Sequence, residues 1–187
     1  MVRSSRSVHH APRWVSIGRK HNPSPPPGIR VWLEDTGSLT QRVLTACNGQ
    51  FSVHVRRQES ARSYYDEAGL LNANPSQFAV IREVELRCDD APWVFARTII
   101  PTSSLRGPAK RLTMLGNKPL GAVLFADPSV IRGRTQFSQL KPGQKLFESA
   151  VAGLSSRPDS LWGRRTLFYL ADKPLLVNEI FLPGIPL

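Results

Sequence analysis

Four segments of the chain carry apolar residues that alternate with polar ones or predominate over the length of a β-strand. They fall into two pairs, and a short turn rich in Asp, Lys and Pro separates the members of each pair. Such pairs predict two antiparallel hairpins. The paired segments are 77–87 with 93–100, and 162–170 with 175–182.

The remaining patterns add one strand and several short helices. Residues 51–56 alternate apolar and polar side chains and predict a further half-buried strand. Ser38 is a good N-cap for a helix that ends near Cys47. Residues 102–125 predict two short helical pieces. Strands joined by short turns, with helices elsewhere, predict an α+β single domain in which helices flank an antiparallel sheet.

Two regions lack such patterns. Residues 1–28 are basic and rich in proline, so we expect a flexible tail there and the folded domain over 29–187. Within the tail, the apolar residues Trp14, Val15 and Ile17 are candidates to dock on the domain. Residues 126–160 are rich in Gly, Pro, Ser and basic side chains. We expect them to form a long flexible connection with one helical patch near 145–151.

The net charge of +11 first suggests a nucleic-acid ligand. Six basic residues and no acidic ones lie within residues 1–30, so more than half of the excess charge lies largely outside the expected domain. The chain shows no zinc finger, no RNA-binding aromatic signature and no convincing helix-turn-helix. We therefore expect no specific nucleic-acid partner, and binding by charge alone stays an alternative.

Composition narrows the remaining classes. The two cysteines, Cys47 and Cys88, are too few for a disulfide scaffold or a four-thiolate zinc site. No apolar run approaches the roughly 18 residues of a membrane span, and the basic N-terminus has no apolar segment behind it. We expect a reduced, soluble, cytoplasmic protein without a bound metal, and a monomer.

Three charged residues interrupt otherwise apolar strand faces. Arg82 shares a face with Val80 and Val84, because alternate residues of a strand lie on one side. By the same alternation Arg97 and Glu179 each lie in an apolar row. A buried guanidinium needs an anionic partner. Two interpretations follow, a buried ion network or a polar site within an apolar pocket.

Four blocks of sequence, in order, resemble the bacterial chorismate pyruvate-lyase family. Each block is weak alone, but the order and spacing of all four make a specific signal. The resemblance covers roughly residues 31–125 and 161–187. The blocks are Trp32-Leu33-Glu34-Asp35; Arg82-Glu83 with Pro92-Trp93 through Ile100-Pro101; Leu115-Gly116 with Pro119-Leu120-Gly121 and Leu124-Phe125; and Leu161 through Arg165 with Lys173 through Pro183.

The resemblance implies an α+β domain that encloses its ligand beneath helical flaps. It also implies conversion of chorismate to 4-hydroxybenzoate and pyruvate, without a cofactor, as the committed step toward the ubiquinone ring. By motif position Arg82 and the main chain of Leu120 bind the ring carboxylate, and Glu179 meets the ring hydroxyl. Arg97 is assigned to the enolpyruvyl carboxylate. Leu39 stands where the family has a methionine that lines the pocket.

One other class is compatible with the same fold. Effector domains of some regulators look similar, so a non-catalytic module that binds small aromatic acids is the alternative to an enzyme. Such regulators carry a DNA-binding domain, and the first 30 residues are too short and too rich in proline to form one.

Overall fold

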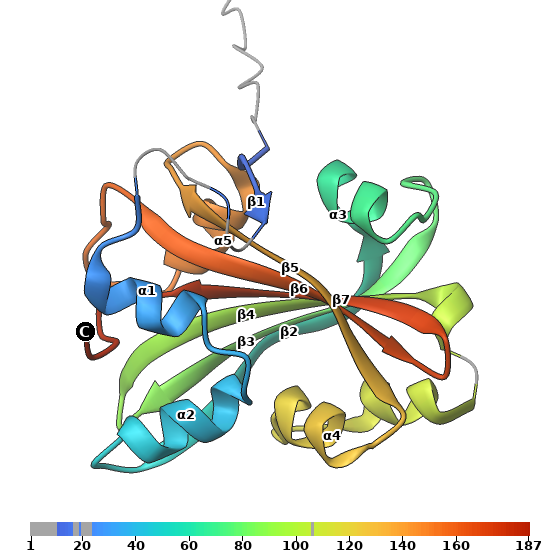
Figure 1. Cartoon of the computed structure of the whole chain (residues 1–187), viewed down its shortest axis with the longest axis horizontal. Helices are drawn as coiled ribbons and strands as arrows, with labels where there is room; N and C mark the ends of the chain where they lie inside the picture. The colour runs from blue at the N-terminus through green and yellow to red at the C-terminus, as the bar shows by residue number, and fades with distance from the viewer. Residues whose placement is uncertain (1–10, 17–18, 20–23, 106) are drawn as a thin grey trace, which may run out of the picture.

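One antiparallel β-sheet runs through the middle of the protein (Figure 1). The computed structural model of the chain describes residues 11–16, 19, 24–105 and 107–187. These residues form a seven-stranded sheet with the order β1-β5-β6-β7-β4-β3-β2, and every neighbouring pair is antiparallel. The strands are β1 (Val15–Ser16), β2 (Phe51–Arg62), β3 (Phe78–Cys88), β4 (Ala91–Pro101), β5 (Val130–Leu140), β6 (Leu161–Leu170) and β7 (Lys173–Phe181).

Helices cover both faces of this sheet. We call the faces the Arg82 face and the Arg97 face, each after one of the buried arginines that it carries. Figure 1 shows α2 and α4 below the sheet, on the Arg82 face, and α3 and α5 above it. The helices are α1 (Pro27–Leu33), α2 (Leu39–Ala46), α3 (Tyr65–Leu70), α4 (Leu120–Ala126) and α5 (Lys145–Val151), with 3-10 helices over Thr102–Ser104 and Gly107–Met114.

The predicted α+β class, both hairpins and the helix after Ser38 are confirmed. The Ser38 hydroxyl accepts a hydrogen bond from the Gln41 amide, which satisfies a free N–H at the start of α2. In the turn between β6 and β7, Ala171 and Asp172 both have positive φ, as a two-residue hairpin turn requires. The β6–β7 register is regular from Leu170 opposite Lys173 onward.

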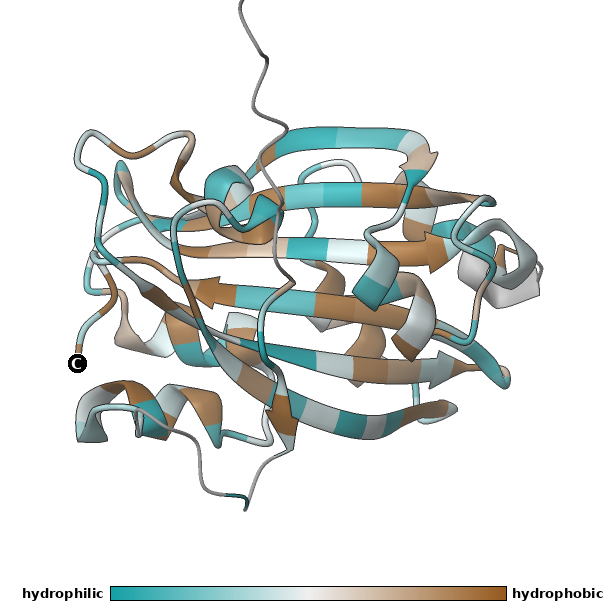
Figure 2. Cartoon of the chain, turned by 90° about the horizontal axis from the view of Figure 1, so that it is seen from above, coloured by the Kyte–Doolittle hydropathy of each residue, from teal (hydrophilic) through white to brown (hydrophobic). Residues whose placement is uncertain are grey.

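A polar band divides the apolar core on each face of the sheet. On the Arg82 face, one apolar cluster surrounds Trp32 and Val43, and another surrounds Leu124 and Phe168. Charged side chains that contact the sheet lie between the two clusters, and the Arg97 face repeats the arrangement. Figure 2 shows the band as teal segments flanked by brown on the central strands. The charged residues found on apolar strand faces therefore belong to this band.

The prediction of a long flexible connection over residues 126–160 is wrong, whereas the helical patch expected near 145–151 is confirmed. This segment contains β5, which pairs with β6 inside the sheet, and α5, whose Phe147 is fully buried. Polar residues dominate the sequence of β5 because much of this strand lies near the edge of the sheet and only Phe137, Ser138 and Leu140 are buried.

The flexible-tail prediction for residues 1–28 is wrong for part of its length, and the docking considered for Trp14 and Val15 is confirmed. Trp14 packs against the cluster around Phe147, and its indole N–H donates to Asp66 at 3.1 Å. Val15 pairs with Phe137 of β5, and α1 already begins at Pro27. Residues 1–10, 17–18 and 20–23 lie outside the described residues, so the docking considered for Ile17 is not described.

The two cysteines form a disulfide, so the expectation of reduced thiols is also corrected. The Cys47–Cys88 bond joins the residue that caps the C-terminus of α2 to the last residue of β3. Its Cα atoms lie 5.6 Å apart, within the usual range for a disulfide. The bond ties one end of α2 to the sheet.

Loss of this bond is expected to destabilise the protein. The bond closes a loop with a sequence separation of 41 residues. Loop-closure entropy of that size corresponds to about 3–4 kcal/mol of unfolding free energy. We expect Cys47→Ser to lower the urea midpoint accordingly, and a reductant to lower the midpoint of the unchanged protein but not of the variant. Equal midpoints for the oxidised protein and Cys47→Ser would contradict a stabilising bond.

Candidate active site

A pocket opens on the Arg82 face, between the sheet and helices α2 and α4. Its lining is mostly apolar, with one cation and one carboxylate among the side chains. Four of the five residues predicted for the site lie in it: Arg82, Glu179, Leu39 and Leu120. The remaining lining residues are Thr40, Val84, Leu86, Ala96, Thr98, Pro119, Gly121, Leu124, Phe125, Phe168 and Val177.

The two helices that cover the pocket each begin at it. Leu39 is the first residue of α2 and Leu120 is the first residue of α4. They approach closely at Gly121, where an added Cβ would lie 2.8 Å from the Thr40 hydroxyl oxygen. A larger residue at position 121 would push the helices apart, so glycine permits the close approach of the helices over the pocket.

Arg82 is a buried cation with no carboxylate partner. Its side chain donates to Gln58 Oε1 at 2.8 Å and to the carbonyl oxygens of Gly116 and Lys118 at 2.8 and 3.2 Å. No Asp or Glu of the described chain lies within 4.0 Å of it. Burial lowers the pKa of Arg82. For Arg82, therefore, the buried ion network left open above does not form among the described residues, and its guanidinium belongs to a polar site within an apolar pocket.

Glu179 is held by an arginine that the sequence reasoning did not select. Arg164 lies directly opposite Glu179 in the β6–β7 register and donates from Nε to Oε2 at 2.6 Å. The same guanidinium donates to the carbonyl oxygens of Trp32 and Asp35, in the segment that connects α1 to α2. Glu179 Oε1 has no hydrogen-bond partner among the described residues. The carboxylate is thus oriented through one oxygen and offers the other to a ligand.

Arg97 does not lie where the sequence predicted. It pairs with Glu83 across β3 and β4, so it lies on the face opposite to Arg82 and Glu179. Its guanidinium contacts Glu67 at 2.9 Å and Glu83 at 2.6 Å. Burial alone would lower the pKa of Arg97, but these carboxylates raise it above its ordinary value. The expected contact of Arg97 with an enolpyruvyl carboxylate is therefore corrected, because this side chain belongs to a buried ion network.

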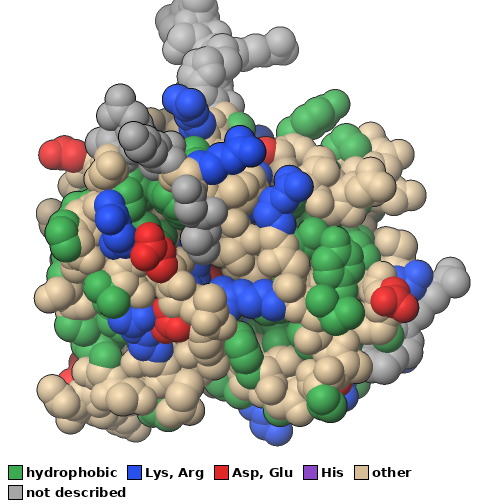
Figure 3. Space-filling view, in the orientation of Figure 1, with side chains coloured by type: hydrophobic (Ala, Val, Ile, Leu, Met, Phe, Trp, Pro, Cys, Tyr) green, Lys and Arg blue, Asp and Glu red, His purple; other side chains and the backbone are tan. Residues whose placement is uncertain are grey.

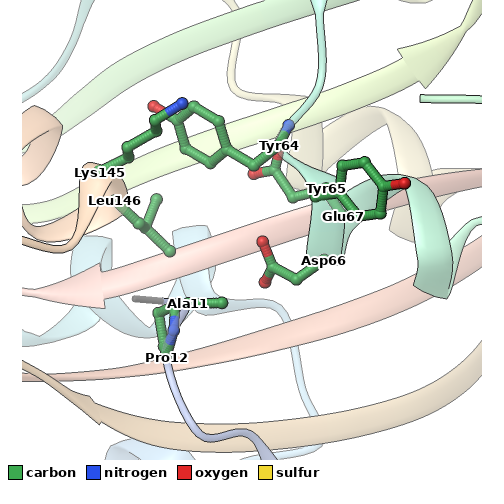
Figure 4. Close-up of a pocket in the computed structure, with 8 residues that line it drawn as sticks. All are labelled: Ala11, Pro12, Tyr64, Tyr65, Asp66, Glu67, Lys145 and Leu146. Carbon is green, nitrogen blue, oxygen red and sulfur yellow. The ribbon is translucent and has the colours of Figure 1, made fainter. Parts of the chain in front are cut away.

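A second cavity lies on the Arg97 face, beside this network. It is lined by Ala11, Pro12, Tyr64, Tyr65, Asp66, Glu67, Lys145 and Leu146 (Figure 4). Both of its carboxylates are already paired, Asp66 with Arg165 and Glu67 with Arg97. The Lys145 ammonium lies 5.6 Å from the centre of the Tyr64 ring. Lys145 has no carboxylate partner within the described chain, but its side chain is exposed, so this cavity lacks a buried unpaired charge like that of Arg82.

Comparison with known proteins shows the family to which the chain belongs. The sequence model of one family, described as chorismate lyase, matches residues 17–186. The chain belongs to the chorismate lyase family. A probable chorismate pyruvate-lyase from Nitrosomonas europaea is 41% identical over 162 residues, which are 87% of this chain and 90% of the relative. One from Aromatoleum aromaticum is 41% identical over 178 residues, 94% of this chain and 95% of the relative. The chain is accordingly a chorismate lyase enzyme, as its sequence blocks predicted.

Solved structures show the same fold at low sequence identity. The effector domain of PhnF from Mycobacterium smegmatis superposes with a TM-score of 0.56 and 15% identity, covering 80% of this chain and 90% of that domain. The ligand-binding domain of a putative GntR-family regulator from Bordetella bronchiseptica gives a TM-score of 0.50 at 15% identity, covering 73% of this chain and 85% of that domain. This likeness concerns the fold, which the chorismate lyase family shares with such effector domains.

Three further observations bear on the other sequence predictions. No helix in the described part of the chain is long and apolar enough to cross a membrane. Among the same residues, no three His, Cys, Asp or Glu side chains gather as a metal site would require. On the side of the chorismate lyase domain shown in Figure 3, Lys and Arg side chains lie singly or in small groups, several of them beside acidic ones, so that side carries no continuous basic surface.

Proposed function

We propose that the pocket on the Arg82 face converts chorismate to 4-hydroxybenzoate and pyruvate. The observation that carries this proposal is that one cation, Arg82, and one carboxylate, Glu179, lie in the same apolar pocket. Arg82 lies on β3 and Glu179 on β7, with β4 between these two strands. At the usual spacing of neighbouring strands, β3 and β7 are about 10 Å apart. A ring with a carboxylate at one end and a hydroxyl at the other can contact both side chains, with its faces against Leu39 and Leu120.

The main task of the protein in this reaction is to hold the substrate in one orientation. The ether bond between the ring and the enolpyruvyl group breaks, the neighbouring ring carbon loses its hydrogen, and the ring becomes aromatic. Arg82 anchors the ring carboxylate through its guanidinium, and the main chain at Leu120 helps to hold the same carboxylate. The Arg82 guanidinium contacts the Gly116 and Lys118 carbonyls in the segment that leads to Leu120, which supports this role. Glu179 accepts a hydrogen bond from the ring hydroxyl. Holding the substrate in one orientation in a pocket that excludes water strengthens each contact.

The departing hydrogen has two routes. It can pass to Glu179 as general base, or directly to the enolpyruvyl methylene through a six-membered cyclic arrangement. In the second route the methylene becomes the methyl group of pyruvate and Glu179 only orients the substrate. Chorismate deuterated at the hydroxyl-bearing carbon distinguishes the routes, because internal transfer retains deuterium in pyruvate.

Product analysis tests the function. Purified protein incubated with chorismate is expected to release 4-hydroxybenzoate and pyruvate in equal amounts, followed by absorbance and by a coupled lactate dehydrogenase assay. Consumption of chorismate without 4-hydroxybenzoate would point to a different reaction. Binding of 4-hydroxybenzoate without any turnover would instead support the effector-type module, which no contact in the pocket favours over catalysis.

Replacement of Glu179 by glutamine is expected to lower kcat by tenfold or more. The amide retains the size of the side chain but removes the charge that faces the hydroxyl and pairs with Arg164. The matched control is Glu59→Gln on the exposed edge strand β2, which should keep full activity. A Glu179→Gln enzyme with the kcat of the unchanged protein would remove Glu179 from the mechanism.

The pathway, the cellular compartment, the oligomeric state and the partners of the enzyme are predicted from the sequence. We propose that the product enters ubiquinone synthesis, that the enzyme acts in the cytoplasm, and that it is a monomer without a specific nucleic-acid partner. Size-exclusion chromatography with light scattering tests the monomer, for which the mass of one chain is 20.8 kDa.

A further inference from the structure

Chorismate carries two carboxylates, and the pocket as described so far accounts for one. Arg82 receives the carboxylate on the ring. Arg97, to which the sequence assigned the carboxylate of the enolpyruvyl group, lies on the other face of the sheet. A carboxylate in an apolar pocket needs a cation or several hydrogen-bond donors. The second carboxylate therefore requires another partner on the Arg82 face.

The chemistry of the substrate says where that partner must lie. The ether carbon and the hydroxyl-bearing carbon are neighbours on the ring, and both lie away from the ring carboxylate. If Glu179 faces the hydroxyl, the enolpyruvyl group projects from the Glu179 end of the pocket. A suitable cation must lie near Glu179 rather than near Arg82.

Arg132 of β5 is outside the pocket lining but lies beside the lining residue Phe168 and close enough to Glu179 for that charge to act on it. It pairs with Phe168 of β6 and so points to the same face as that pocket residue, and its guanidinium carbon is 6.0 Å from the centre of the Phe168 ring. The guanidinium donates to the carbonyl oxygens of Thr36 and Asp35. The carbonyl of Asp35 also accepts from Arg164, the partner of Glu179. Arg132 and Arg164 thus donate to the same carbonyl oxygen, that of Asp35, and Arg164 in turn holds Glu179.

The electrostatic surroundings of Arg132 favour an added anion. No carboxylate of the described chain lies within 4.0 Å of it, and the Asp35 carboxylate is paired with Arg42 instead. Burial, followed by the nearby charge of Arg164, lowers the pKa of Arg132, although Glu179 and Asp35 partly oppose the shift. Two cations, Arg132 and Arg164, thus lie near the single carboxylate of Glu179, and only Arg164 is paired with it.

The hydrogen-bonding capacity of Arg132 is not exhausted. A guanidinium has five N–H donors, and the two bonds of Arg132 to carbonyl oxygens use one donor on each terminal nitrogen. The remaining donors can meet a carboxylate while the bonds to the α1–α2 segment persist. Arg164 is less suited, because it is 1% exposed and its Nε and Nη1 donors already hold Glu179 and the carbonyls of Trp32 and Asp35.

We propose that Arg132 binds the carboxylate of the enolpyruvyl group and thereby distinguishes the substrate from the aromatic product. The inference rests on the proposed function, because it assumes that chorismate enters the pocket with its hydroxyl at Glu179. The product 4-hydroxybenzoate lacks the second carboxylate, so it gains nothing from Arg132. The same contact stabilises the negative charge that develops on the departing enolpyruvate oxygen and its carboxylate.

The test compares substrate and product in one variant. Arg132→Ala is expected to lower kcat/KM for chorismate by about 100-fold, the loss of a charge-assisted contact of roughly 3 kcal/mol. Its Kd for 4-hydroxybenzoate, measured by calorimetry, should stay within twofold of the unchanged protein. Arg132→Lys should recover part of the activity. Arg134→Ala is the matched control, since Arg134 is exposed on the same strand.

The outcomes separate the inference from the function on which it rests. An Arg132→Ala enzyme with unchanged kcat/KM overturns the inference while leaving the function intact. Equal losses in chorismate turnover and in 4-hydroxybenzoate binding also overturn it, because they indicate that Arg132 only holds the α1–α2 segment in place. Failure of the unchanged protein to convert chorismate contradicts the proposed function itself.

Discussion

Replacing Arg82 by alanine is expected to lower kcat/KM for chorismate by at least tenfold. The loss should reach about 100-fold if the guanidinium makes a full charge-assisted contact with the ring carboxylate. The substitution removes a cation that is 3% exposed and that has no carboxylate partner within the described chain. The hydrogen-bond partners of Arg82, Gln58 and two carbonyl oxygens, are neutral and do not balance its charge. An anionic ligand in the apolar pocket supplies the missing negative charge. Steady-state kinetics with chorismate, together with calorimetric titration of 4-hydroxybenzoate, measure the effect.

The effect of Arg82→Ala should appear in both substrate and product binding, in contrast to Arg132→Ala. Both ligands carry the ring carboxylate, so the Kd for 4-hydroxybenzoate should rise in parallel with the loss of kcat/KM. Arg57→Ala is the control, because Arg57 is an exposed residue of the neighbouring strand β2 paired only with the exposed Glu59. If Arg82→Ala stays folded and keeps its affinity for 4-hydroxybenzoate, the ring carboxylate binds elsewhere.

Replacing Arg97 by methionine is expected to reduce the free energy of unfolding by about 3–5 kcal/mol. The substitution removes the cation that lies between Glu67 and Glu83, and both of these carboxylates are themselves buried. Two negative charges would remain in the interior without compensation. Urea denaturation followed by circular dichroism measures the change. The control is Arg157→Met, which breaks a partly exposed pair with Glu148 and should cost less than about 1 kcal/mol.

A combined variant shows whether the loss arises from unpaired charge. Adding Glu67→Gln and Glu83→Gln to Arg97→Met removes the uncompensated carboxylates and should recover part of the lost stability. Retention of stability by Arg97→Met alone would show that the network on the Arg97 face does not hold the fold. Loss of activity without loss of stability would return Arg97 to the catalytic site.

The error over Arg97 has a definite structural cause. Alternation within one strand shows which of its residues share a face, but the face that a neighbouring strand presents depends on the register between them. A regular hairpin continued from the pairs Cys88–Ala91 and Arg87–Pro92 would place Arg82 directly opposite Arg97. The register shifts between Leu86 and Arg87, so that Arg82 pairs with Thr98 and Arg97 turns to the other face. Nothing in the local sequence specified this irregularity.

The register of the other hairpin, between β6 and β7, follows directly from its sequence. Between β6 and β7 the two-residue turn and the unbroken register place Arg164 opposite Glu179, and counting back from Ala171-Asp172 would have identified this partner. The roles of Arg82 and Glu179 came from their apolar neighbours together with the resemblance. Their convergence on one pocket with Leu39 and Leu120 depends on how α2 and α4 pack, which periodicity does not determine.

Long-range pairing explains the remaining differences. The strand β5 has few buried residues and joins the sheet through β6, so its sequence resembles that of a loop. Trp14 and Val15 belong to the fold because they meet partners on α3 and β5 far along the chain. The disulfide likewise joins cysteines separated by 41 residues, and only the approach of α2 to the end of β3 brings them together.

A crystal structure of the protein with 4-hydroxybenzoate tests the central claim most directly, since that claim assigns opposite ends of one pocket to the two polar groups of the ring. We predict the ring between Leu39 and Leu120, with its carboxylate on the Arg82 guanidinium and its hydroxyl on Glu179 Oε1. A ring bound in the reverse orientation, or in the cavity beside Tyr64 on the Arg97 face, would contradict the account.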